Sequence, residues 1–197
     1  MLTAPFRNAE EIFGRALLDR EPVVFPTDTI YGIGAPLSDK TANEKIFDIK
    51  GRDRNKPFPV LISSFEQAEE LAYFDERQKR IMDFLWRNGS FTLLLRGKEN
   101  VDDLYKLNGT IALRIPCLSI LKQLINKMGP LSATSANPSG VEYDPKVENI
   151  FKYFKDLVHY FIIGKNTEIV SSTIIDLTTQ TPRLLRGNFD ISRLDGI

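Results

Sequence analysis

Residues 23–34 read Val23-Val24-Phe25-Pro26-Thr27-Asp28-Thr29-Ile30-Tyr31-Gly32-Ile33-Gly34. The apolar residues at each end predict two extended segments, and the turn-prone residues between them predict a break. Hydroxyl groups and a carboxylate lie between the apolar ends, and they are costly to bury without partners. Either a polar ligand or a tight turn capped by side chains can supply those partners.

Short strands and helices intermix on both sides of this stretch. Helices are predicted over residues 8–19, 39–49, 118–128 and 147–155, with two more that begin after Ser64 and Asp75. Strands are predicted over residues 57–62, 91–95, 110–115, 131–135, 158–163, 172–177 and 183–186. Several neighbouring strands have no room for a crossover helix, which favours one twisted mixed sheet flanked by helices in an α/β domain. We expect residues 1–197 to form a single domain.

Composition excludes several classes of protein. With 26 basic and 26 acidic residues the net charge is zero, which argues against nonspecific coating of nucleic acid. Cys117 is the single cysteine and His159 the single histidine, so cysteine clusters and histidine-based triads are not expected. We expect both residues to be structural, Cys117 as a buried apolar residue at a helix start. No signal-peptide or membrane-span pattern occurs, and the cytoplasm is the expected location.

A basic segment, Lys50-Gly51-Arg52-Asp53-Arg54-Asn55-Lys56, joins a predicted helix end to a strand. A solvated helix end is one reading, since basic residues interact favourably with the helix dipole there. The other reading is a polyphosphate site, because Gly51 lets the chain turn so that an ammonium and a guanidinium can face one cleft.

A second polar segment reads Ser132-Ala133-Thr134-Ser135-Ala136-Asn137-Pro138-Ser139-Gly140. Its small side chains would let a ligand approach backbone amides, which can donate to an anion. An ordinary Asn-Pro turn explains the segment equally well on composition alone.

Six motifs, taken in order, resemble the YrdC-like family of threonylcarbamoyl-AMP synthases. They are Pro26 to Gly32, Lys50-Gly51-Arg52, Gly109 to Pro116, Ser135-Ala136-Asn137, Ser172 to Leu177 and Leu184-Leu185-Arg186-Gly187. The resemblance extends over roughly residues 10–190 and implies the family fold, a twisted mixed sheet with a concave, positively lined cleft.

The resemblance implies a nucleotidyltransferase that forms threonylcarbamoyl-AMP and pyrophosphate from L-threonine, bicarbonate or CO2, and ATP. Mg²⁺ is expected with the ATP, and no protein side chain is identified as its ligand. Partner proteins would transfer the threonylcarbamoyl group to tRNA, giving threonylcarbamoyladenosine. Direct tRNA binding would be weak, and no membrane partner is expected.

Residue roles follow from the matched motifs. The resemblance implies ATP-binding roles for Lys50, Arg52, Lys56, Thr110, Ser135, Asn137, Tyr143 and Arg186, with Lys50 and Arg52 catalytic. It implies threonine-binding roles for Thr29, Tyr31, Arg114, Ala133 and Ser172, with Arg114 facing the carboxylate. Leu61 stands where some family members have a histidine near threonine, and Arg186-Gly187-Asn188 departs from Arg-Pro-Gly.

Two other functions remain open. An RNA-binding module without chemistry is suggested by the basic segment, although zero net charge and the lack of a basic face interleaved with aromatics weigh against it. The second alternative function is a carbamoylation role like that of the YrdC-like domain in hydrogenase maturation proteins. We expect this chain to be the short, one-domain form of the family instead.

Overall fold

The computed structural model describes residues 1–164 and 171–197, and the strand built from Val23–Phe25 (β2) lies near the middle of a five-stranded sheet. The strand order is β1-β11-β2-β3-β10, where the other strands are β1 (Leu2–Pro5), β11 (Tyr160–Ile163), β3 (Gly32–Gly34) and β10 (Thr134–Ser135). β1, β11 and β2 run parallel, and β3 is antiparallel to both β2 and β10.

A second sheet has eight strands and also mixes directions. Its main path is β13-β12-β6-β8-β4-β9, with β5 paired to β6 and β7 paired to β8. The bounds are β4 (Val60–Leu61), β5 (Ala72–Tyr73), β6 (Phe91–Gly97), β7 (Lys106–Leu107), β8 (Thr110–Arg114), β9 (Leu131–Ser132), β12 (Thr173–Asp176) and β13 (Arg183–Arg186). The expectation of one mixed sheet is therefore wrong, although the α/β class and the mixed strand directions are confirmed. The chain passes from one sheet to the other at Ala133, between β9 and β10.

Six α-helices occur in the described part of the chain: α1 (Ala9–Asp19), α2 (Lys40–Lys50), α3 (Phe65–Leu71), α4 (Glu76–Asn88), α5 (Ser119–Met128) and α6 (Val147–Phe154). Three short 3-10 helices are η1 (Phe6–Asn8), η2 (Asp103–Tyr105) and η3 (Ile191–Leu194). The Asp75–Gln78 pair forms the expected reciprocal cap at the start of α4. At the start of α3, the Gln67 side chain accepts a hydrogen bond from Ser63 N, so the expected reciprocal cap between Ser64 and Gln67 does not form. None of the described helices combines the length and apolar character needed to span a bilayer.

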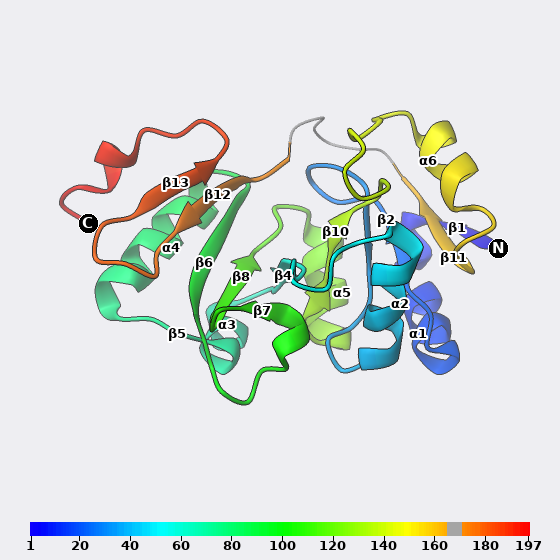
Figure 1. Cartoon of the computed structure of the whole chain (residues 1–197), viewed down its shortest axis with the longest axis horizontal. Coiled ribbons are helices and arrows are strands. Elements are labelled where there is room, and N and C mark those ends of the chain that lie inside the picture. Colours follow the sequence, from blue (N-terminus) through cyan, green and yellow to red (C-terminus); the bar gives the residue numbers. More distant parts are fainter. Residues whose placement is uncertain (165–170) are drawn as a thin grey trace.

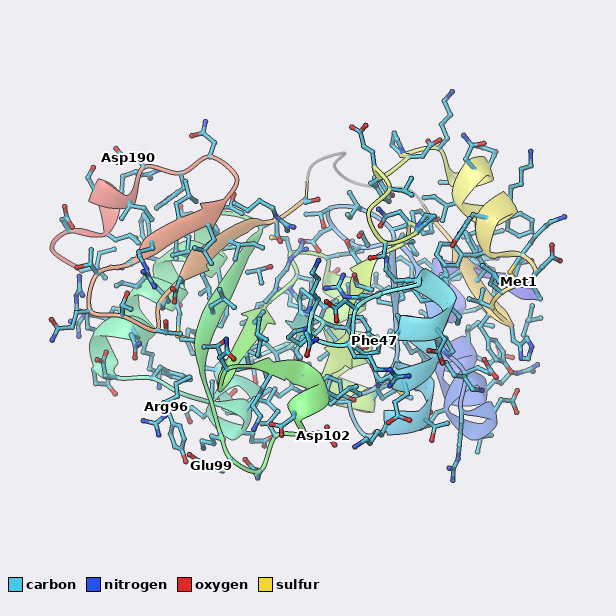
Figure 2. All side chains as sticks on the ribbon, in the orientation of Figure 1. Met1, Phe47, Arg96, Glu99, Asp102 and Asp190 are labelled. Carbon is cyan, nitrogen blue, oxygen red and sulfur yellow. The ribbon has the colours of Figure 1, made fainter. Side chains whose placement is uncertain are left out.

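The five-stranded sheet is covered on both faces because alternate residues of its strands point to opposite sides. Val23 and Phe25 pack with apolar residues of α1 and α5, while Val24 packs with residues of α2 and α6. Figure 1 shows these helices around the sheet, with the N-terminus at this end of the molecule and the C-terminus at the other. In Figure 2, Met1 and Asp190 mark the two ends, and Phe47 lies between them.

At β6 and β8, one face of the eight-stranded sheet is covered by an apolar core cluster. Leu93, Leu95, Ile111 and Leu113 point to α4 and form the largest core cluster with its buried residues. The intervening residues of the same strands point the other way, toward the five-stranded sheet. This second face carries the candidate site.

Candidate active site

A cavity of about 610 Å³ lies between the two sheets, within the range of roughly 300–1,000 Å³ that is usual for small-molecule sites. One wall is the open face of the eight-stranded sheet. Its lining residues alternate along the strands, with Thr92 and Leu94 from β6 and with Thr110, Ala112 and Arg114 from β8. Strand periodicity therefore determines which side chains of these apolar strands can reach a ligand.

The opposite wall comes from the segments on either side of β3. Thr27, Thr29 and Tyr31 precede or enter the strand, and Ser135 lies on the neighbouring β10. Arg52 and Lys56, which follow α2, also line the cavity. Three segments far apart in the sequence thus meet at one cavity.

Among the described lining residues, the charged ones are all cationic: Arg52, Lys56, Arg114 and Arg186. Hydroxyl groups supply most of the remaining polar lining. Low-dielectric walls strengthen the attraction between such cations and an anion. The cavity is therefore suited to an anionic ligand of several charges, as a nucleoside triphosphate is.

Arg52 is held by its own loop. Its Nε donates to Lys56 O at 2.7 Å and its Nη2 donates to Pro57 O at 3.2 Å, while the guanidinium lies 5.4 Å from the centre of the Phe58 ring. Burial lowers the pKa of Arg52, but an arginine remains charged in proteins. These contacts leave further N–H groups of the fork for a ligand, so Arg52 can bind phosphate without unfolding its loop.

Lys50, which the sequence predicts to bind phosphate, does not line the cavity. It is 4% exposed, and its ammonium donates to Ser135 O, to Asn137 O at 2.6 Å and to Asn137 Oδ1 at 3.4 Å. Burial lowers its pKa to about 7, and repulsion from Arg52 adds to the effect. Lys50 therefore ties the end of α2 to the Ser135–Asn137 turn.

Replacing Lys50 with methionine is expected to loosen that turn. The variant leaves buried carbonyl groups of Ser135 and Asn137 without their donor, which typically costs about 1–3 kcal/mol. Urea denaturation of the two proteins checks this value. An unfolding free energy equal to that of the wild type would show that Lys50 does not hold the turn.

Asn137 and Tyr143 also lie outside the cavity lining and support it from behind. The Asn137 side-chain amide donates to Val141 O within its own turn. Tyr143 accepts a hydrogen bond from Tyr31 N at 2.9 Å. The Tyr31 hydroxyl in turn donates to Gly164 O at 2.7 Å and accepts from Gly164 N at 2.8 Å. Of the expected ATP-binding residues, Lys50, Asn137 and Tyr143 do not line the cavity, and their ATP-binding roles stay predictions.

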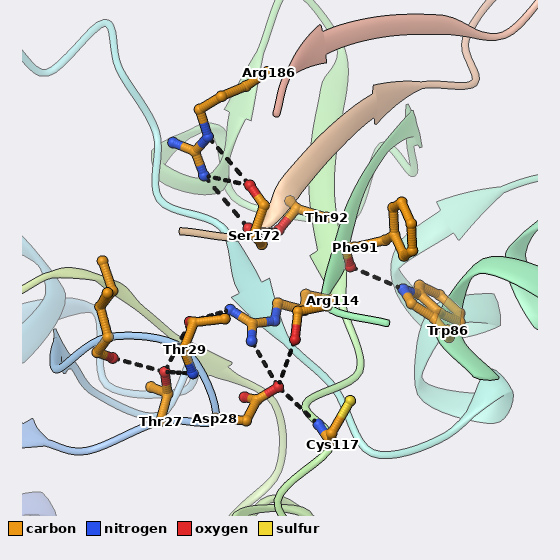
Figure 3. A network of polar contacts seen from close by, with 12 residues as sticks. Thr27, Asp28, Thr29, Trp86, Phe91, Thr92, Arg114, Cys117, Ser172 and Arg186 are labelled. Carbon is orange, nitrogen blue, oxygen red and sulfur yellow. Dashed lines mark hydrogen bonds and ion pairs between the residues drawn. The ribbon is translucent and has the colours of Figure 1, made fainter. Parts of the chain in front are cut away.

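Arg114 ends β8 and is joined to the Thr27–Tyr31 segment. Its Nη1 donates to Thr29 Oγ1 at 2.9 Å, and its Nη2 lies 2.7 Å from Asp28 Oδ2 (Figure 3). Leu61, on the adjacent strand β4, pairs with Arg114 in the sheet and also lines the cavity. The residue at the histidine position of some family members is therefore an apolar neighbour of Arg114.

Arg186 and Ser172 meet on the rim of the same wall. Arg186 Nη2 donates to Ser172 O at 3.0 Å and to Ser172 Oγ at 3.4 Å, and Ser172 Oγ shares a hydrogen bond of 2.8 Å with Thr92 Oγ1 (Figure 3). Burial lowers the pKa of Arg186, and the neighbouring Arg114 lowers it further. Two guanidinium groups facing one cavity favour an anion between them.

Sequence reasoning missed Asp28 and Thr92. The sequence marks Asp28 only as a carboxylate that is costly to bury without a partner, and in the structure that partner is the distant Arg114. Thr92 interrupts the apolar strand Phe91–Leu95, and a hydroxyl at an alternating position was the available signal. The expectation that Cys117 is buried is wrong, since the residue is exposed. The His159 side chain is 70% exposed beside Glu21, and its structural role stays a prediction.

The chain is an α/β protein with two mixed sheets and a cavity between them, and the charged residues among the described lining are all cationic. A protein-family profile described as "Telomere recombination" (Sua5_yciO_yrdC) matches residues 15–187. The chain belongs to this YrdC/Sua5 family.

Three relatives are compared with this chain by sequence identity, coverage and, for the two crystal structures, TM-score. A putative threonylcarbamoyl-AMP synthase of Mycobacterium leprae is 33% identical over 175 residues, which cover 87% of this chain and 80% of the relative. A crystal structure of Pyrococcus abyssi Sua5 complexed with L-threonine has a TM-score of 0.83 at 32% identity, covering 94% of this chain but 57% of that one. The crystal structure of Escherichia coli YciO has a TM-score of 0.80 at 25% identity and covers 94% and 92% of the two chains.

Proposed function

We propose that the protein is an L-threonylcarbamoyladenylate synthase that uses L-threonine, bicarbonate or CO2, and ATP. The observation that supports the proposal is that one cavity is lined by two sets of cationic and hydroxyl side chains, each suited to a different anionic group. Arg114 with Thr29 provides a site for a carboxylate, and Arg52 with Lys56 provides a site for phosphates. The L-threonine complex of the P. abyssi relative supports the amino acid as the second substrate.

The proposed chemistry needs positioning and charge stabilisation rather than a side-chain nucleophile. The threonine amine attacks CO2 and loses a proton to solvent, giving a carbamate. A carbamate oxygen then forms a bond to the α-phosphorus of ATP while the bond to the β-phosphate oxygen breaks and pyrophosphate leaves. Negative charge grows on the phosphate oxygens during this step, and nearby cations stabilise it.

Each wall of the cavity has a part in this scheme. Arg114 binds the α-carboxylate and Ser172 and Thr29 lie beside it, which orients the amine. Arg52 and Lys56 bind the phosphate chain at the opposite side. Holding both reactants in one cavity accounts for a large part of the acceleration expected for such a reaction. Mg²⁺ bound to the triphosphate would neutralise further charge, and the described cavity lining supplies no carboxylate to hold the ion independently.

Lys50 has a supporting part in this scheme, with Asn137 and Tyr143. They keep the Ser135 turn and Tyr31 in place, as their hydrogen bonds indicate. We further propose that residues 1–197 form one domain of this family and that its product passes to proteins that modify tRNA.

The test is release of pyrophosphate by the purified protein. It should require threonine, bicarbonate and ATP together, and radiolabelled threonine should appear in an adenylate. Pyrophosphate release that does not depend on threonine, across several divalent metals, would contradict the proposal. If tRNA instead binds in a salt-sensitive way and no nucleotide is turned over, the RNA-binding alternative is favoured.

A further inference from the structure

The carboxylate of Asp28 links three separate parts of the chain through a single oxygen atom. Asp28 Oδ2 lies 2.7 Å from Arg114 Nη2, accepts from Cys117 N at 2.9 Å and accepts from Ser90 Oγ at 3.2 Å (Figure 3). Ser90 lies between α4 and β6, and Cys117 precedes α5. Asp28 therefore connects the Thr27–Tyr31 segment of one sheet to the end of β8 in the other.

Asp28 is buried behind the cavity rather than in it. The residue is 5% exposed, and it does not line the cavity, whereas Arg114 does. A bound ligand would thus touch the guanidinium and not the carboxylate. Any effect of Asp28 on binding must act through Arg114.

The guanidinium of Arg114 has contacts at two of its nitrogens. Nη1 donates a hydrogen bond to the Thr29 hydroxyl, and Nη2 forms an ion pair with Asp28 Oδ2 at 2.7 Å without the geometry of a hydrogen bond. The two contacts together restrict where the guanidinium can lie. The side chain of Arg114 is 7% exposed, and a buried guanidinium that loses its carboxylate partner is strongly destabilised. The nearby cation of Arg186 adds repulsion that Asp28 offsets.

We propose that Asp28 is a positioning residue that holds the Arg114 guanidinium in the cavity wall, ready for the carboxylate of the amino acid substrate. The inference rests on the proposed function, in which Arg114 binds that carboxylate. In this proposal threonine binding also depends on the Asp28 carboxylate, which contacts none of the substrates.

The direct test is Asp28→Asn, which keeps the shape of the side chain and removes its charge. We expect the KM for threonine to rise about tenfold or more, because a charge-assisted contact to the guanidinium is lost. The KM for ATP and kcat should stay within about twofold of the wild type, since the phosphate side of the cavity is unchanged. Asp28→Glu keeps the charge and should recover part of the threonine affinity.

A matched control and a double variant separate positioning from general damage. Asp83 forms an ion pair with Arg87 at 2.8 Å on the surface of α4, and Asp83→Asn should leave all three kinetic constants unchanged. In an Arg114→Gln background, Asp28→Asn should have almost no further effect on the threonine KM. If Asp28→Asn changes kcat and both KM values alike, or if its effects add to those of Arg114→Gln, the proposal is overturned.

Cys117 supplies a readout that does not need catalysis. It is the single cysteine of the chain, and although the residue is exposed, partial desolvation of the thiol, followed by the charge of Asp28, raises its pKa, while Ser90 and Arg114 lower it. Asp28→Asn should therefore lower the thiol pKa and speed the reaction with a disulfide reagent at neutral pH. An unchanged pH profile together with unchanged threonine binding by calorimetry would overturn the proposal in a folded variant.

The two proposals fail in different ways. Wild-type protein that binds threonine but releases no threonine-dependent pyrophosphate would contradict the proposed function and leave the Asp28 comparison measurable by calorimetry. Active wild-type protein with an Asp28→Asn variant of unchanged threonine KM would contradict the role of Asp28 alone. Wild-type protein that binds no threonine would contradict both.

Discussion

Replacing Arg52 with alanine is expected to lower kcat for adenylate formation by about 100-fold or more, the usual cost of removing one group that stabilises transition-state charge. Arg52 lines the cavity beside Lys56 and keeps N–H groups available after its bonds to the loop carbonyls. In the proposed reaction these groups would face the α-phosphate region, where negative charge grows. Steady-state kinetics of pyrophosphate release measures the change.

Arg54 offers a matched control for this variant. It lies two positions away in the same loop, it does not line the cavity, and its ion pair with Asp48 is exposed. Arg54→Ala should therefore keep kcat within about twofold of the wild type, because exposed ion pairs contribute little. Equal losses in the two variants would show that loop order, and not the position of Arg52, is responsible.

Replacing Gly34 with alanine is expected to give the largest loss of stability. A Cβ at this position would lie 1.9 Å from the backbone oxygen of Ser132, far inside a normal contact. The backbone on both sides is fixed by strand pairing, since Gly34 pairs with Val23 and Ser132 pairs with Val60. The two sheets meet here, so relief requires movement of one against the other. We expect a loss of about 3 kcal/mol or more.

Thermal denaturation tests this prediction, and a fall of about 6 °C or more is expected for a chain of this size. Gly14 supplies the control, because a Cβ there meets nothing within 4 Å and the residue lies inside α1. Gly14→Ala should be neutral or slightly stabilising, as alanine restricts the unfolded chain. If the Gly34→Ala protein has the same melting temperature as the wild type, the backbone where the two sheets meet can move to accommodate the Cβ.

The local features of the fold were readable from the sequence, because they depend on neighbouring residues. The cap formed by Asp75 and Gln78 needs only four consecutive positions, and the strand Val23–Phe25 is marked by its own composition. The division into two sheets was not readable. It depends on β4 pairing with β8 on one side and β9 on the other, which no local pattern encodes.

For the site, the sequence predicted which residues gather at the cavity, and the roles assigned to them stay predictions. Arg52, Ser135, Arg114 and Arg186 meet at one cavity, as the ordered motifs indicated. The burial of Lys50 could not be predicted, because a lysine at a helix end is usually exposed and its acceptors are distant carbonyl groups. The pairing of Asp28 with Arg114 is likewise a contact between distant segments.

In the proposed reaction this cavity joins L-threonine, CO2 and ATP into one adenylate. Incubation of the protein with ATP, L-threonine and ¹⁴C-bicarbonate, followed by chromatography and mass spectrometry, tests it most directly. We expect a labelled product with the mass of threonylcarbamoyl-AMP, formed with pyrophosphate and lost when threonine is omitted or Arg52 is replaced by alanine. No labelled adenylate from the wild-type protein, or equal labelling without threonine, would contradict it.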